Sequence, residues 1–252
     1  MAETDINQLR VFLDSLLEPA RFNDYCPNGL QVEGRPQVVK LATGVTACQA
    51  LIDEAIEWGA DAILVHHGLF WRGDDPCVGG IKRRRLTALL QHEVSLLAYH
   101  LPLDAHSRYG NNAQLGALLG IEARCAAAES GDVPVWHGKL VAPLSGADFA
   151  ARLGRALGRT PLHIAAGRSV SRVAWCTGAA QGFIGSAVAL GVDAYVTGEA
   201  SEPSVHTARE SDIHFYAAGH HATERYGVRA LGDHIAQTLG IEHRFIDIDN
   251  PV

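Results

Sequence analysis

One seven-residue phrase occurs twice in this chain, and it constrains the fold more than any other feature. Residues 59–65 read GADAILV, and residues 191–197 read GVDAYVT. The apolar positions of the helical segment before each phrase recur at the same offset, and so does the short strand before that helix. Any two strand–helix–strand units look broadly alike, so chance similarity is the alternative. The shared Gly-x-Asp-Ala favours two related units that arose by internal duplication.

The pattern around the first phrase is typical of an α/β protein. It predicts an amphipathic helix over residues 5–17, a strand over 38–43, a helix over 47–58 and a strand over 62–65. Short connections between strand, helix and strand predict parallel pairing, and a continuous apolar run predicts a strand that is covered on both faces. We therefore expect two related α/β lobes with mostly parallel sheets.

The first lobe is expected over residues 1–125 and the second over residues 126–252, with the segment 221–252 packing on the first lobe. Residues 126–170 have weaker signals, apart from a helical stretch at 153–157. In folds of this class, ligands bind beyond the carboxyl ends of the strands, where loops emerge. The residues that follow each predicted strand are therefore the first candidates for a functional site.

Composition narrows the classes of function. The 252 residues carry a formal charge of −7, which argues against nucleic-acid binding, since that needs a basic surface. Five scattered cysteines without a CxxC form neither a zinc knuckle nor a disulfide framework. No apolar window is long enough for a transmembrane helix, and the acidic N-terminus is unlike a signal peptide, so we expect a cytoplasmic protein with no membrane partner. The unusual number is 13 histidines, because histidine is the commonest metal ligand.

Two adjacent histidines, His66 and His67, follow the apolar run 62–65. Adjacent side chains in extended backbone point to opposite sides, so one ion is an awkward target for both. Either Gly68 permits a turn, or two ions lie side by side and each takes one ring. The alternative is a pair of structural histidines whose hydrogen bonds are satisfied at a strand end.

A second candidate segment, residues 99–106, follows the apolar run 94–98 and contains His100, Asp104 and His106. Pro102 argues against a regular helix, so we expect an irregular loop, where functional groups concentrate. The alternative for Asp104 is a role as a helix cap or turn residue.

The third candidate pair, His220 and Glu224, lies at the start of a helix that is expected to run to Leu239. Residues four apart share one face of a helix, and helical metal motifs use this spacing. The alternative is a solvated first turn, in which glutamate is favoured by the helix dipole. Together, these three segments supply nitrogen and oxygen ligands without cysteine, a set that suits Zn, Fe, Mn or Mg. Five or more ligands exceed one tetrahedral site and suggest a pair of ions bridged by a carboxylate.

Several short motifs together resemble a known family, the Nif-three-like dinuclear metal-centre proteins, also called type 2 GTP cyclohydrolase 1 homologs. The resemblance extends over essentially the whole chain. The motifs are PNGLQVEG at 27–34, TGVT at 43–46, VHHG at 65–68, LPLDAH at 101–106, NN at 111–112, TGE at 197–199 and GHHATE at 219–224.

This resemblance implies two divalent metal ions per chain, held by His66, His67, Asp104, His220 and Glu224. It also implies three-layer α/β/α lobes, a ring-shaped homohexamer with the metal pairs facing its cavity, and a cyclohydrolase-like activity.

We therefore expect a dinuclear metal-dependent hydrolase, in which a metal-bridging hydroxide attacks a nucleotide-like or phosphoester small molecule. His100 is the expected catalytic proton shuttle, with His106 as the other candidate, because imidazole titrates near neutral pH. The alternative function is a non-catalytic hexameric metal-binding scaffold or regulatory protein. Glu199 occupies the duplicated counterpart of His67 and is expected to support the ligands. The basic run 82–85 is expected to be a solvated helix face, with a phosphate clamp as the alternative.

Overall fold

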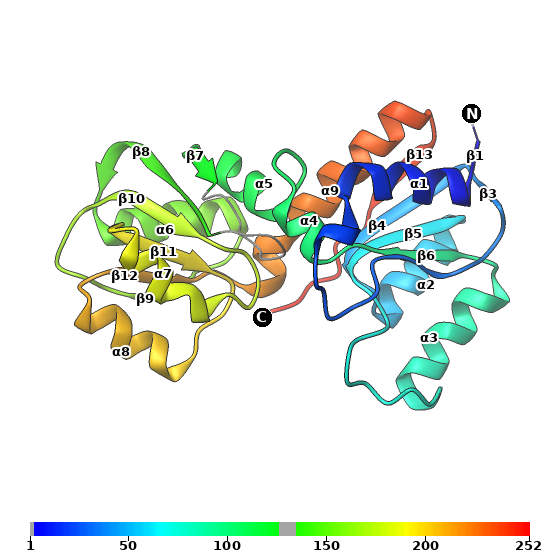
Figure 1. The fold of residues 1–252 in the computed structure, drawn as a ribbon, viewed down its shortest axis with the longest axis horizontal. Coiled ribbons are helices and arrows are strands. Elements are labelled where there is room, and N and C mark those ends of the chain that lie inside the picture. The colour runs from blue at the N-terminus through cyan, green and yellow to red at the C-terminus, as the bar shows by residue number, and fades with distance from the viewer. Residues whose placement is uncertain (1–2, 126–134) are drawn as a thin grey trace. The chain divides into compact units, whose positions relative to one another are not determined.

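The structure is a computed structural model that describes residues 3–125 and 135–252, so part of the weakly patterned segment 126–170 lies outside the described residues. The chain divides into two compact units (Figure 1). The first unit contains residues 1–103 and 227–249, and the second contains residues 104–226 and 250–252. These units are defined by contacts within the chain, whereas the lobes expected from the sequence follow the duplication; the lobe boundary stays a prediction.

The first unit is built on a five-stranded sheet whose strand order is β13-β4-β5-β6-β2. The first three pairings in that order are parallel, and β2 joins the edge antiparallel to β6. A separate two-stranded antiparallel sheet joins β1 to β3. The strands of this unit are β1 (Thr4–Asp5), β2 (Gly29–Val32), β3 (Gln37–Val38), β4 (Lys40–Thr46), β5 (Ala62–His67), β6 (Ser95–Ala98) and β13 (Glu242–Phe245).

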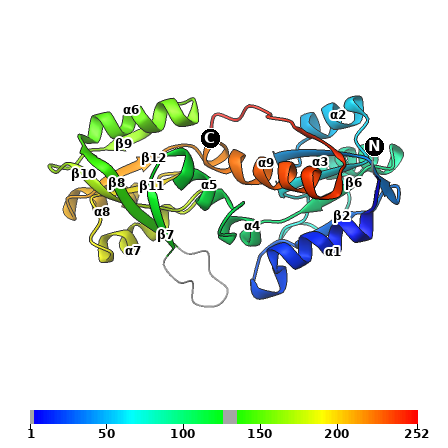
Figure 2. The same cartoon turned by 90° about the horizontal axis from the view of Figure 1, so that it is seen from above.

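Helices cover both faces of this sheet, which makes the first unit three layers thick (Figures 1 and 2). One face is covered by α2 and α3, and the other by α1 and the part of α9 after Gly227. The core contains apolar side chains of β5 and β6 against α2 and Leu89 of α3. Its helices are α1 (Ile6–Leu17), the 3-10 helix η1 (Pro19–Arg21), α2 (Gln49–Trp58) and α3 (Gly80–Gln91).

The local sequence explains where α1 begins and which side of it is buried. Asp5 caps its first turn by accepting the backbone amide of Asn7, and Gln8 completes a capping box. Ile6, Leu9, Leu13 and Leu17 are buried at helical spacing. The helix predicted over 5–17 is therefore confirmed.

The second unit is built on a six-stranded sheet whose strand order is β7-β8-β10-β11-β12-β9. Its centre, β10-β11-β12, is parallel, and the pairings toward both edges are antiparallel. Its strands are β7 (Glu122–Cys125), β8 (Trp136–Leu144), β9 (Leu162–Ile164), β10 (Val170–Trp175), β11 (Ala194–Thr197) and β12 (His214–Ala217). Its helices are α5 (Asn111–Leu118), α6 (Gly146–Leu157), the 3-10 helix η2 (Gln181–Phe183), α7 (Ile184–Ala189) and α8 (Glu202–Glu210).

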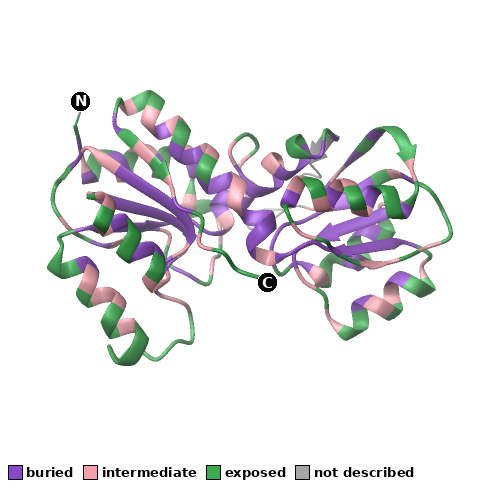
Figure 3. Cartoon of the chain, turned by 180° about the vertical axis from the view of Figure 1, so that it is seen from behind, coloured by how far each residue is buried: buried purple, intermediate pink, exposed green. Residues whose placement is uncertain are grey.

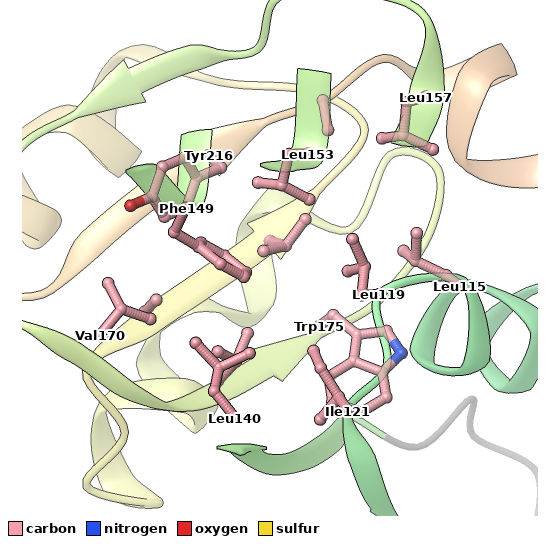
Figure 4. Packing of buried hydrophobic residues seen from close by; sticks show 14 of the residues in the cluster. Leu115, Leu119, Ile121, Leu140, Phe149, Leu153, Leu157, Val170, Trp175 and Tyr216 are labelled. Atoms are coloured by element: carbon pink, nitrogen blue, oxygen red, sulfur yellow. The ribbon is translucent and has the colours of Figure 1, made fainter. Parts of the chain in front are cut away.

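Alternating side chains of the central strands explain the three layers of the second unit. Val173 and Trp175 point into a cluster with helices α5 and α6, shown in Figure 4. Ala174 and Cys176 belong to a second cluster, on the side of α7 and α8. Figure 2 shows α6 and the pair α7–α8 on opposite faces of this sheet. Because both faces are covered, the central strands β11 and β12 are buried along their length (Figure 3), and the predicted α/β fold is confirmed.

The repeated phrase performs the same structural task in each unit. Asp61 accepts the backbone amides of Val39 and Lys40 at 2.9 and 3.0 Å. Asp193 accepts the amides of residues 171 and 172 at 3.0 and 2.8 Å. In both units, the aspartate joins the start of one strand to the start of its parallel neighbour.

Two further helices contain residues of both units. α4 (Leu101–Ala105) lies where we expected an irregular loop, and that expectation is wrong. Pro102 is the second residue of this short helix, and a first-turn proline removes no intrahelical hydrogen bond. α9 (His220–Leu239) agrees with the predicted helix. Among the described residues, no helix is long and apolar enough to cross a membrane.

Candidate metal centre

His66 and His67 end strand β5 in the first unit, and their rings lie together. His66 is fully buried, and His67 is partly buried. Their ring centroids are 4.5 Å apart, so the divergence expected of adjacent side chains does not keep the rings apart. Each ring is held through Nδ1: His66 Nδ1 lies 3.1 Å from the carbonyl oxygen of Tyr99, and His67 Nδ1 lies 2.9 Å from Thr46 Oγ1.

The hydrogen bond to Tyr99 defines the chemical form of His66. A carbonyl oxygen only accepts, so neutral His66 carries its hydrogen on Nδ1 and keeps a lone pair on Nε2. In a metal-ligating histidine, one ring nitrogen usually donates its hydrogen to a protein oxygen, and the lone pair of the other ring nitrogen binds the metal.

His100 joins these two histidines. Its ring centroid lies 4.9 Å from that of His66 and 5.7 Å from that of His67. One nitrogen from each ring lies within 4.8 Å of the others, which makes the three residues a group that could hold a metal ion.

In the second unit, the carboxylate of Asp104 is buried and held by side chains. Asn111 Nδ2 donates to Asp104 Oδ1 at 2.8 Å, and Thr177 Oγ1 donates to the same oxygen at 3.4 Å. Asn112 Nδ2 donates to the Asp104 backbone oxygen at 3.2 Å. These three donors come from α5 and from the residues after β10, so the strand end contributes to the placement of the acid.

His220 and Glu224 lie on the first two turns of α9, as their spacing predicts. His220 Nε2 is 3.2 Å from Glu224 Oε2. The Glu224 side chain is only 3% exposed, which excludes the alternative of a solvated first turn. Gly178, at a φ of +69°, leaves the room for this pair: a Cβ there would overlap Glu224 Oε1 and lie 3.3 Å from His220 Nε2.

The other ring nitrogen of His220 is held by Glu199, whose Oε1 lies 2.7 Å from Nδ1. Glu199 therefore holds the ring of His220, a predicted ligand, and its role as the support of a metal ligand stays a prediction. Burial acts to lower the pKa of His220, but the hydrogen bonds and charges of Glu224 and Glu199 raise it to about 9.

The candidate ligand residues of the second unit have side chains of a kind that binds divalent cations. Two buried carboxylates are costly unless positive charge compensates them. Burial, and then the charges of Asp104 and Glu224, raise the pKa of the Cys176 thiol above its usual range. Oxygen and imidazole ligands suit the metals expected from the sequence, and several buried groups of His, Asp and Glu among the described residues could hold an ion.

Other predicted candidates have local roles. His106 Nδ1 accepts the backbone amides of Arg108 and Tyr109 at 3.2 and 3.0 Å, and its ring stacks on Tyr109. Lys82 of α3 donates to the backbone oxygen of Asp75 at 3.0 Å. His106 therefore stabilises a turn, which leaves His100 as the stronger candidate for proton transfer.

Sequence reasoning missed Asp24, which contacts His100. Asp24 Oδ1 lies 2.9 Å from His100 Nδ1, and the two residues are 76 positions apart. A lone aspartate in a loop rich in Asn, Pro and Gly has the signal of a turn residue, so no local pattern marked it.

Comparison with known proteins gives a consistent result. The family model Duf34/NIF3 (NGG1p interacting factor 3) matches residues 4–251. A Pseudomonas aeruginosa protein named "GTP cyclohydrolase 1 type 2 homolog" is 58% identical over 240 residues, which are 94% of this chain and 95% of that protein. An Escherichia coli K12 protein of the same name is 50% identical, with both chains covered in full.

A solved structure of a Thermus thermophilus protein superposes with a TM-score of 0.90 at 34% identity, covering 99% of this chain and 100% of that one. The match of the family model over nearly the whole chain, and identities of 50% and above to the two bacterial relatives, leave one conclusion. The chain belongs to the Duf34/NIF3 family.

Proposed function

We propose that this protein is a dinuclear metal-dependent hydrolase whose ligands are His66, His67, Asp104, His220 and Glu224. The observation that carries the proposal is the support given to the ligand residues. Protein oxygens hold Nδ1 of three histidines, and two carboxylates are buried beside hydrogen-bond donors or a ligand histidine. Such support orients ligands for a metal and is a frequent feature of metalloenzymes.

Two bound divalent ions would supply a water of lowered pKa and polarise the bond to be cleaved. The residues of the chain supply the rest. Glu199 orients His220, and the Tyr99 carbonyl orients His66. His100, held through Nδ1, accepts and returns a proton at Nε2.

The proposed substrate is a nucleotide-like or phosphoester small molecule. The support for a nucleotide is the name that the relatives carry, "GTP cyclohydrolase 1 type 2 homolog". We further propose that the protein acts as a homohexamer, the assembly that the sequence resemblance implies.

Metal content and activity, measured on the full chain, test this proposal. Protein is stripped with chelator and reloaded with Zn²⁺, Mn²⁺, Fe²⁺ or Mg²⁺, and elemental analysis is expected to find about two equivalents, the number that a two-metal site needs. The loaded protein is screened against nucleotides and phosphoesters beside the Glu224→Gln variant, with Glu202→Gln of the exposed helix α8 as a matched control.

The hydrolase proposal predicts turnover that Glu224→Gln abolishes and Glu202→Gln leaves intact. Two equivalents of metal without any turnover in the screen would instead favour the non-catalytic scaffold. A reproducible single equivalent would contradict the dinuclear centre, and light scattering that shows a monomer at micromolar concentration would contradict the hexamer.

A further inference from the structure

Asp24 is a buried carboxylate that is surrounded by donors. Its side chain is 4% exposed, although it lies in the loop before β2. Five donors reach its two oxygens: the backbone amides of Tyr25, Cys26 and Leu101, Asn28 Nδ2 and His100 Nδ1, at distances of 2.7, 3.4, 2.9, 3.0 and 2.9 Å. Burial opposes its ionisation, but the hydrogen bonds from His100, Asn28 and Leu101 hold the pKa of Asp24 well below its usual range.

The His100 ring is fixed on its other sides as well. The backbone amide of His100 donates to Asn28 Oδ1 at 2.8 Å. The rings of Tyr25 and Trp71 meet it edge to face, with centroids 5.0 and 5.2 Å away and interplanar angles of 71° and 84°. The His100 side chain is 7% exposed, so neither rotation of the ring nor exchange of its partner for water is easy.

A carboxylate on Nδ1 also fixes the tautomer. Ionised Asp24 only accepts, so neutral His100 must carry its hydrogen on Nδ1 and keep the Nε2 lone pair. The same relation makes the histidine of a Ser-His-Asp triad competent as a base, since the aspartate holds the ring in the tautomer and orientation that the reaction needs.

We propose that Asp24 is a positioning residue that locks the ring of His100, which lies beside the rings of His66 and His67, in the Nδ1–H tautomer and so keeps its lone pair on Nε2. The part that His100 plays in hydrolysis rests on the proposed function. The tautomer and orientation of the ring do not, because they follow from contacts inside the first unit.

Nuclear magnetic resonance of the metal-free, full-length protein tests the lock directly. With ¹⁵N-labelled histidine at pH 8, long-range ¹H–¹⁵N correlations distinguish the two tautomers. We expect wild-type His100 to be wholly Nδ1–H and Asp24→Asn to give a mixture, because an amide can donate as well as accept. A wild-type His100 in the Nε2–H form would overturn the proposal, whether or not any variant folds.

The Asp233→Asn variant is the matched control. Asp233 Oδ1 lies 2.9 Å from His243 Nδ1 in the same unit, so this variant should alter the His243 signals and leave those of His100 unchanged. If Asp24→Asn leaves the His100 tautomer intact, the lock is disproved.

Kinetics separate this inference from the proposed function. If the wild type hydrolyses a substrate, Asp24→Asn should lower kcat by about 10²–10⁴-fold while KM and metal content stay nearly constant, as expected when a base loses its tautomer. A variant that loses the tautomer but keeps its kcat would refute the positioning role. A locked tautomer in a protein without turnover would refute the hydrolase proposal and retain the lock.

Discussion

Glu199 Oε1 lies 2.7 Å from His220 Nδ1, so a residue just after strand β11 holds a residue at the start of α9. Glu199 is the counterpart of His67 in the duplicated phrase. Equivalent positions at the carboxyl ends of the two strands therefore supply a proposed ligand in one unit and a support for a proposed ligand in the other. The Glu199–His220 pair therefore allows the role of a supporting residue to be tested by mutation without changing a proposed ligand.

Replacing Glu199 with glutamine should weaken metal binding by about 10–100-fold, the usual cost of losing the partner that orients a ligand. The amide keeps the shape of the side chain but loses the charge that orients His220. Competition with a chromogenic chelator measures the affinity. Glu202→Gln removes a comparable but exposed carboxylate–histidine contact, with His206, and should leave the affinity unchanged. Equal affinities for all three proteins would exclude the support role of Glu199.

Replacing Gly178 with alanine should abolish most metal binding and lower stability by more than about 1 kcal/mol, since alanine disfavours a positive φ. The new methyl group would displace Glu224, whose Oε1 it would overlap. Gly185→Ala is the control, because a Cβ at that position meets nothing within 4 Å. Calorimetry and elemental analysis measure the two effects. Full metal occupancy in Gly178→Ala would show that Glu224 need not stay where it lies.

Asp61→Asn and Asp193→Asn should each lower the free energy of unfolding by about 1–3 kcal/mol. In each aspartate one oxygen, Oδ2, accepts both backbone amides, and the other oxygen faces an arginine, Arg35 or Arg168. An asparagine that keeps its oxygen on the amides turns its NH₂ group toward that arginine and loses the negative charge that strengthens all of these contacts. Denaturant unfolding measures the change, and Glu57→Gln on the exposed face of α2 serves as the control. A large effect at only one of the two aspartates would contradict their structural equivalence.

Cysteine reactivity should follow burial and pKa. Burial, and then the charge of Asp24, raise the pKa of Cys26 to about 12, so its thiolate is scarce at pH 8 and still scarce at pH 9.5. Cys77 is exposed and should alkylate rapidly, whereas Cys26 and the buried Cys176 should react only after unfolding. Peptide mass mapping after iodoacetamide treatment distinguishes them. Rapid labelling of Cys26 in folded protein would show that its loop opens.

Much of the fold could be predicted from hydrophobic periodicity. Helices α1, α2 and α9 and strand β5 lie within a few residues of their predicted positions, because each has a clear apolar stripe or run. Strand β2 was missed. Its residues lie in a loop rich in turn formers, and only pairing with β6, far along the chain, makes them a strand.

The duplication could be recognised at its repeated phrase but less well beyond it. In the sequence alone, residues 98–100, which read AYH, are most similar to residues 218–220, which read AGH. Strand register shifts this match by one residue, because Ser95 and His214 pair with the equivalent Ala62 and Ala194. Both registers keep a small residue at the strand end, and only the hydrogen bonds distinguish them.

For the candidate site, too, some residues could be predicted from the sequence and others could not. The rule that function lies beyond strand ends leads to His66, His67 and His100, and helical spacing leads to His220 and Glu224. The groups that hold the candidate residues, such as Asp24 beside His100 and Thr177 beside Asp104, can be identified only from the folded structure. Their partners are distant in sequence, so no local pattern contains them.

The discontinuity of the first unit has a consequence for synthesis on the ribosome. The strands of the second unit come from one stretch, from β7 to β12, whereas those of the first unit include β1 at the start of the chain and β13 near its end. Strand β4 pairs with β13, which is synthesised much later, and the hydrogen bond between Thr43 and His243 spans 200 residues. Until residues 227–249 emerge, the nascent chain exposes an unpaired edge of β4, the kind of edge that templates aggregation. A chaperone that shields this edge should therefore raise the yield of soluble protein more than one acting after release.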